Sequence, residues 1–109
     1  MAALPTFHIV VHPRAEDDLD RIIAGIAYES PLNGARFALR LAQKIKSLQR
    51  LPAACPYARE NGHASIEVRQ LLVGSYRVIF NIQSTTVHVL RVIHAKRDTL
   101  PPDELPDPR

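Results

Sequence analysis

The sequence predicts one α+β domain with the element order strand, helix, helix and three strands. Two observations lead to this fold class: two consecutive segments carry apolar residues at helical spacing, and the second half carries short β-branched runs separated by turn residues. The order contains no internal repeat and no alternation of strands with helices, which excludes a doubly wound parallel sheet. We therefore expect a helical hairpin that covers one face of a four-stranded sheet.

The first half of the chain predicts a strand followed by two antiparallel helices. Residues 7–12 are mostly β-branched or aromatic, and Pro13 ends that strand and begins a helix that runs to the break at Ser30. Ser30 or Asn33 can cap a second helix, which ends before Pro52. The apolar positions repeat every three or four residues, at Ala15, Leu19, Ile22, Ile23 and Ile26 in the first helix and at Phe37, Leu41, Ile45 and Leu48 in the second.

The second half predicts three strands, at residues 67–73, 76–83 and 87–94, after a loop over residues 52–64. The last strand is the most apolar, as a central strand would be. After Lys96 the chain combines four prolines with acidic residues, a composition that opposes both helix and strand. We therefore divide the chain into a domain of residues 1–98 and an acidic, proline-rich tail of residues 99–109, which is extended or ordered only by a partner.

Composition agrees with a single globular domain. A chain of 109 residues with 46% hydrophobic and 23% charged residues can bury a core without disulfides. No segment approaches the roughly 18 uncharged apolar residues of a membrane-spanning helix, and the N-terminus lacks the pattern of a signal peptide, so we expect a cytoplasmic protein with no membrane partner. Cys55 is the only cysteine, which excludes an internal disulfide and a cysteine-based metal site within one chain.

The histidines do not suggest a metal site. His8 and His12 share one face of the first predicted strand, but four residues of strand separate them by about 13 Å. His88 and His94 are further apart still along the last strand. The sequence also lacks a glycine-rich phosphate loop, so we expect no metal and no cofactor.

Charge is distributed unevenly along the second half of the chain. Residues 66–97 contain one acid, Glu67, and five basic residues, namely Arg69, Arg77, Arg91, Lys96 and Arg97. Residues 98–109 reverse this balance, with four acids against one arginine. A basic half followed by an acidic tail indicates a polyanionic or acidic partner surface.

Three segments together resemble a known family. A predicted strand ends before a Pro-x-Ala-x-x-Asp-Leu helix start at residues 13–19, a Gly-Ser-Tyr-Arg-Val-Ile-Phe run occupies residues 74–80, and Leu-Arg-Val-Ile-His-Ala-Lys-Arg-Asp occupies residues 90–98. This combination resembles the RelE/ParE toxin superfamily from about Phe7 to Asp98, nearer to the ParE-like, plasmid-stabilisation branch. The resemblance implies a β-α-α-β-β-β fold whose sheet is mainly antiparallel.

The resemblance also implies the toxin half of a type II toxin–antitoxin pair, which an antitoxin neutralises by wrapping an extended segment around it. RelE-like members cut mRNA on the ribosome, whereas ParE-like members trap DNA gyrase without chemistry of their own. A shared fold does not choose between these two branches.

The residues favour a binding inhibitor over an enzyme. Arg77 and Arg97 match the two arginines of the RelE-type site, but residues 68–72 lack the alternating lysines of that site, and no tyrosine follows Tyr76. A nuclease would need Arg69 or His94 as a substitute for the missing acid or base.

We therefore expect a ParE-like gyrase inhibitor whose surface for gyrase or antitoxin carries Arg69, Arg77, Arg91, His94 and Arg97. Arg77 and Arg91 have a simpler alternative as solvent-facing strand residues whose stems cover apolar surface. Two other functions stay open: a ribosome-dependent mRNA endonuclease, whose partners are the ribosome and mRNA, and a non-toxic binding homologue. A homodimer or a toxin–antitoxin hetero-oligomer would be compatible with any of them.

Overall fold

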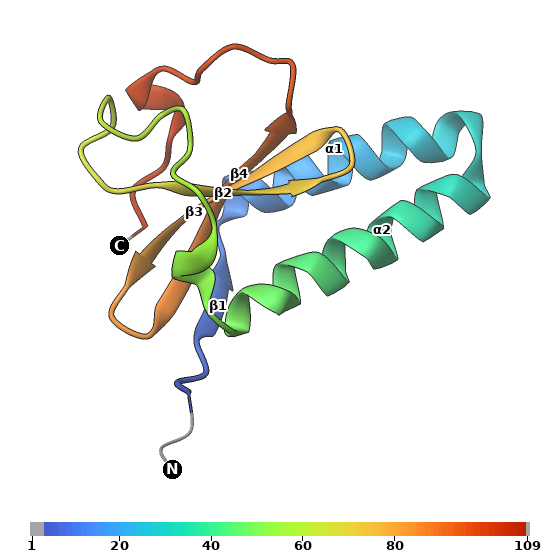
Figure 1. The fold of residues 1–109 in the computed structure, drawn as a ribbon. Helices are drawn as coiled ribbons and strands as arrows, with labels where there is room; N and C mark the ends of the chain where they lie inside the picture. Colours follow the sequence, from blue (N-terminus) through green and yellow to red (C-terminus); the bar gives the residue numbers. More distant parts are fainter. Residues whose placement is uncertain (1–3, 109) are drawn as a thin grey trace.

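The computed structural model describes residues 4–108 and has the predicted element order (Figure 1). The α+β fold class is confirmed. Short 3-10 turns follow the second helix, open the loop that begins at Pro52, and lie in the tail. No helix in this part of the chain is long and apolar enough to cross a membrane. The helices and strands are β1 (His8–Val11), α1 (Pro13–Glu29), α2 (Pro31–Lys46), β2 (Arg69–Val73), β3 (Tyr76–Gln83) and β4 (Thr86–His94).

The described residues form one four-stranded sheet in the order β1-β4-β3-β2. β3 runs antiparallel to both β2 and β4, because tight turns join these strands, with Gly74 at φ +59° and Ser84 at φ +54°. The helical hairpin follows β1 along the chain, and β1 pairs with β4, the last strand, in parallel orientation, with Ile9 opposite Val87. The sheet is mainly antiparallel and β4 lies in its centre, as the sequence predicts.

The two helices pack antiparallel on one face of the sheet and extend past the β2–β3 turn (Figure 1). Ser30 separates them: its backbone N–H closes α1 by donating to Ile26, and its hydroxyl accepts the Asn33 N–H at 3.2 Å to cap α2. Of the two predicted caps, Ser30 is the one used. A Cβ atom on Gly34 would lie 2.7 Å from the Ala27 Cβ, so glycine permits close contact between the helices there.

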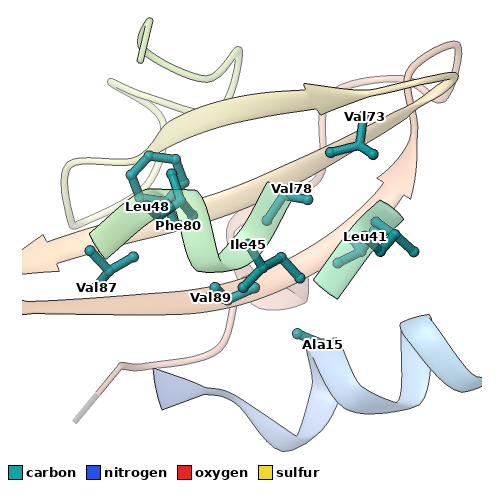
Figure 2. Close-up of a cluster of buried hydrophobic side chains, with 10 residues drawn as sticks. Ala15, Leu41, Ile45, Leu48, Val73, Val78, Phe80, Val87 and Val89 are labelled. Carbon is teal, nitrogen blue, oxygen red and sulfur yellow. The ribbon is translucent and has the colours of Figure 1, made fainter. Parts of the chain in front are cut away.

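The main hydrophobic core lies between the helices and the sheet (Figure 2). Side chains of α2 lie over those of β3 and β4, and Leu41, Leu48 and Phe80 are almost completely buried. The buried members are Ala15, Leu41, Ile45, Leu48, Val73, Val78, Phe80, Val87, Val89 and Val92. Seven of the nine residues in the predicted helical stripes belong to this core or pack against it, whereas Ile23 and Ile26 are not among its members.

A second core covers the opposite face of the sheet, where the sequence predicts no helix. Its buried members are Ala58, Val68, Ile79, Leu90, Ile93 and Leu100. The loop after α2 and the C-terminal tail both pack on this face (Figure 1). One extra residue on β4, a bulge at Leu90 between the Phe80–Val89 and Ile79–Arg91 pairs, helps to keep Leu90 and Ile93 on the same side.

The expectation that the tail is extended or ordered only by a partner is therefore wrong for residues 99–108. Leu100 is 2% exposed in the second core, and Leu105 packs against it. The prolines and acids of the tail do not prevent ordering, because these two leucines gain apolar contact with the sheet. Residue 109 lies outside the described residues.

The helix contact predicts opposite effects for two glycine substitutions. Gly34→Ala should lower the free energy of unfolding by about 1–3 kcal/mol, because its Cβ would press on Ala27. Gly25→Ala is the matched control: nothing lies within 4 Å of its added Cβ, and alanine favours the helix by up to about 1 kcal/mol. Urea unfolding measures both, and equal stability of the two variants would contradict the close contact.

Candidate functional site

Arg77, one of the predicted site residues, is fully buried and neutralised inside the domain. Its Nη1 and Nη2 donate to the two carboxylate oxygens of Glu60 at 2.9 and 3.0 Å, and Nη1 also donates to Gln70 at 2.9 Å. Both partners of the ion pair are 0% exposed. Glu60 accepts a further hydrogen bond from the Leu100 N–H at 2.8 Å, so this carboxylate joins β3, the loop after α2 and the tail.

The Glu60 carboxyl has a lowered pKa even though it is buried. Burial alone would raise its pKa, but the hydrogen bonds from the Arg77 guanidinium and from the Leu100 amide, together with the positive charge of Arg77, hold the pKa of Glu60 below its ordinary value of 4.5. The folded state therefore keeps the charged pair.

Arg91 is also internal and is paired with Asp18 of α1. Its Nε and Nη2 donate to the two Asp18 oxygens at 2.7 and 3.1 Å, and its Nη1 donates to the backbone carbonyl of Glu104 at 2.8 Å. Asp18 also accepts the Val92 N–H at 2.9 Å, on the part of β4 that extends beyond β1. The pair fastens α1 and the tail to the centre of the sheet.

Arg69 is half-buried near the start of the edge strand β2. It donates to the Cys55 carbonyl at 2.7 Å, and its guanidinium lies 4.2 Å from the centre of the Tyr57 ring. Its Nε also lies 3.5 Å from a carboxylate oxygen of Glu67. These local contacts fix Arg69 against the loop.

His94 and Arg97 are the two predicted site residues that the structure brings together on the surface. Both line a hollow of about 250 Å³ at the end of β4. The His94 ring lies edge-on to Tyr76 at 5.3 Å, and Arg97 is 47% exposed and donates to Glu104 at 2.7 Å.

The five predicted residues thus do not lie together on one surface, as the sequence predicts for a site that binds gyrase or antitoxin. Arg77 and Arg91 do not face solvent either, which also corrects the alternative reading of them. The loop and the tail cover Arg77 on the second sheet face, whereas Asp18 of α1 together with the tail encloses Arg91.

Three adjoining hollows form one groove under the helical hairpin, here called the hairpin groove. The first, with His94 and Arg97, shares Arg21, Ile22 and Tyr76 with a second of about 400 Å³. The second shares Ile26 and Asn33 with a third of about 280 Å³. The apolar lining comes from Ile22, Ile26, Phe37 and Tyr76. The polar rim is mostly basic and includes Arg21, Arg36, Arg40 and Arg97 together with His94 and one exposed acid, Glu29.

Sequence reasoning assigned no function to Arg21, Arg36 and Arg40. The available signal was their position off the apolar stripes of the two helices, which places them on exposed faces. Arg21 is 72% exposed even though it contacts the buried Asp18 at 2.6 Å. Within residues 4–108 no group of three histidine, cysteine or acidic side chains is placed to hold a metal ion.

The sequence matches the family model described as ParE toxin of the type II toxin–antitoxin system parDE, over residues 9–99. The chain belongs to the ParE toxin family. The resemblance read from the sequence is confirmed, and so is the coarser function, a toxin of a type II toxin–antitoxin system. Among curated proteins no sequence relative matches.

Solved structures place this ParE-family chain among toxin–antitoxin proteins. A chain of the chromosomal ParDE system from Pseudomonas aeruginosa is 17% identical with a TM-score of 0.70, the match covering 84% of this chain and 98% of that one. A chain of the RelBE2 toxin–antitoxin complex from Mycobacterium tuberculosis is 25% identical with a TM-score of 0.51. This match covers 88% of the present chain and 100% of the RelBE2 chain. The ParDE likeness supports the fold alone.

The buried Glu60–Arg77 pair predicts a pH-dependent stability. Because its folded pKa is below 4.5, Glu60 stabilises the domain above that pH and loses this contribution as the pH falls through the lower folded value. Glu60→Gln should cost about 3–5 kcal/mol at neutral pH, since Arg77 is left buried and unpaired. Its unfolding free energy should also fall less than that of the parent protein on acidification below pH 4.5.

Urea unfolding between neutral pH and acid measures both effects. Glu67→Gln, in the same loop but 56% exposed, is the control and should cost at most about 1 kcal/mol. An unchanged acid dependence in Glu60→Gln would show that this carboxylate is not the one that titrates with unfolding.

Proposed function

We propose that this ParE-family toxin inhibits DNA gyrase by protein–protein binding, and that a cognate antitoxin neutralises it by filling the hairpin groove. The resemblance to the ParE-like branch supports gyrase as the target. The observation that carries the antitoxin site is the groove itself, which combines an apolar lining with accessible arginines. Membership of a type II toxin–antitoxin family and the likeness to a chain of the RelBE2 toxin–antitoxin complex support a partner of this kind.

The groove fits an acidic, amphipathic peptide segment. Ile22, Ile26 and Phe37 offer apolar surface to aliphatic anchors, and the Phe37 and Tyr76 rings lie 5.4 Å apart. Arginines on the rim can hold carboxylates through paired hydrogen bonds. Of the five residues assigned from the sequence, we therefore retain His94 and Arg97 as contacts and add Arg21, Arg36 and Arg40.

The burial of Arg77 favours a binding inhibitor over an mRNA endonuclease. Cleavage of RNA needs a cation within hydrogen-bond reach of the charged phosphorane. Arg77 matches one arginine of the RelE-type site, yet its guanidinium is already paired with Glu60 at 0% exposure. His94 and Arg97 lie at the hairpin groove instead, and so they fit recognition of a partner. A toxin of this kind would act in the cytoplasm and, with its antitoxin, stabilise the plasmid that carries the pair.

The decisive experiment is DNA supercoiling by purified gyrase in the presence of this protein. We expect inhibition with accumulation of cleaved DNA, and we expect messages on translating ribosomes to stay intact. If gyrase is unaffected and messages are cut, the protein is an mRNA endonuclease and not a gyrase inhibitor. If neither assay shows an effect, the protein is a non-toxic binding homologue.

The same assay tests the groove when the antitoxin is added. Arg97→Ala should raise the antitoxin concentration needed to restore supercoiling by about tenfold, the loss of one charged hydrogen-bonded contact. Lys96→Ala removes the neighbouring exposed charge, which does not line the groove, and should leave that concentration unchanged. Equal effects of the two variants would contradict the assignment of Arg97.

A further inference from the structure

The helical hairpin is electrostatically divided. The segment from Ser30 to Arg59 contains six basic residues and no acid, whereas residues 13–29 contain five acids and two arginines. Among residues 4–108, none of the four cations of α2 forms an ion pair with a carboxylate. The positive charge of α2 is therefore available to an external partner.

Every side chain on one exposed flank of α2 and its C-cap carries a hydrogen-bond donor, and none is acidic or apolar, although the Ser47 hydroxyl already donates to the Lys44 carbonyl. The members of this flank recur at helical spacing, and all are exposed: Asn33, Arg36, Arg40, Gln43, Lys44 and Ser47. We call this flank the donor stripe. The other exposed flank differs, because Leu32 and Leu39 lie there together with Lys46. Lys44 and Lys46 also complement the helix dipole in the last turn, but Arg36 and Arg40 lie too far from the C-terminus for that role.

We propose that the donor stripe binds the phosphate backbone of duplex DNA. Contacts to phosphate come from arginine, lysine, serine, asparagine and glutamine side chains, and the donor stripe consists of these residue types. An acidic protein partner would require apolar anchors at the centre of the contact, and these lie beside the stripe, in the hairpin groove, and not within it. Single-stranded RNA would require exposed aromatic rings for stacking, and the exposed Tyr28 and Tyr57 lie outside the stripe.

The spacing of the cations suits one strand of a duplex. Arg36, Arg40 and Lys44 follow one another by about 6 Å along the helix, so together they span about 12 Å. Phosphates of one DNA strand recur about every 3.4 Å along the duplex axis, so the three cations extend over three to four of them. Arg36 and Arg40 also rim the hairpin groove, and an antitoxin segment there would compete with DNA.

This inference does not depend on gyrase as the target, because DNA binding can be measured with the toxin alone. The probe is a short fluorescent duplex, and anisotropy gives its affinity at increasing KCl concentrations. Three phosphate contacts predict a slope of log affinity against log salt of about −2.7, and Lys44→Ala should reduce its magnitude by about 0.9. Lys46→Ala removes the same charge from the same turn on the other flank, and should leave the slope unchanged.

A second variant distinguishes weaker DNA binding from a loss of folded protein. Gln43→Glu places a negative charge in the donor stripe without removing a cation, and should weaken duplex binding severalfold while thermal melting stays unchanged. The proposal is overturned if the duplex is not bound at low salt, or if Lys44→Ala and Lys46→Ala weaken binding equally. It is also overturned if poly-glutamate or single-stranded RNA of equal length binds more tightly than the duplex.

Discussion

A buried guanidinium must be neutralised, and this constraint organises both faces of the sheet. Glu60 neutralises Arg77 on one side, and Asp18 neutralises Arg91 at the junction with α1. Each carboxylate also accepts a backbone N–H, from Leu100 and Val92 respectively, so both pairs connect segments that are distant in sequence. Removal of one partner would leave an uncompensated charge in the interior, which is far more costly than loss of a surface pair.

The same two pairs decide which cations stay accessible on the surface. Because Arg77 and Arg91 are paired in the interior, these two cations are absent from the surface. The loop and the tail cover the second face of the sheet. The accessible cations are those of the helical hairpin and of the end of β4, around a groove with an apolar lining. Within a fold shared by nucleases and binding inhibitors, this arrangement favours binding.

Much of the fold follows from local patterns in the sequence. The stripe containing Leu41 and Ile45 defines a helix, and Gly74-Ser75 between two mainly apolar segments defines a hairpin. The site could not be predicted in the same way, because strand alternation does not reveal whether the polar face is covered. Glu60 lies 17 residues from Arg77, and Asp18 lies 73 from Arg91, so neither pair has a local signal.

In our proposal, internal carboxylates withdraw the sheet arginines from contact with a partner and leave partner binding to the hairpin groove. Phenylglyoxal modification, read residue by residue by mass spectrometry with and without the cognate antitoxin, tests this most directly. The account predicts that Arg77 and Arg91 resist modification in both states, whereas Arg21, Arg36, Arg40 and Arg97 react in the free toxin and become protected in the complex. Reaction of Arg77 in the folded free toxin, with protection by antitoxin and none at the groove, would contradict it.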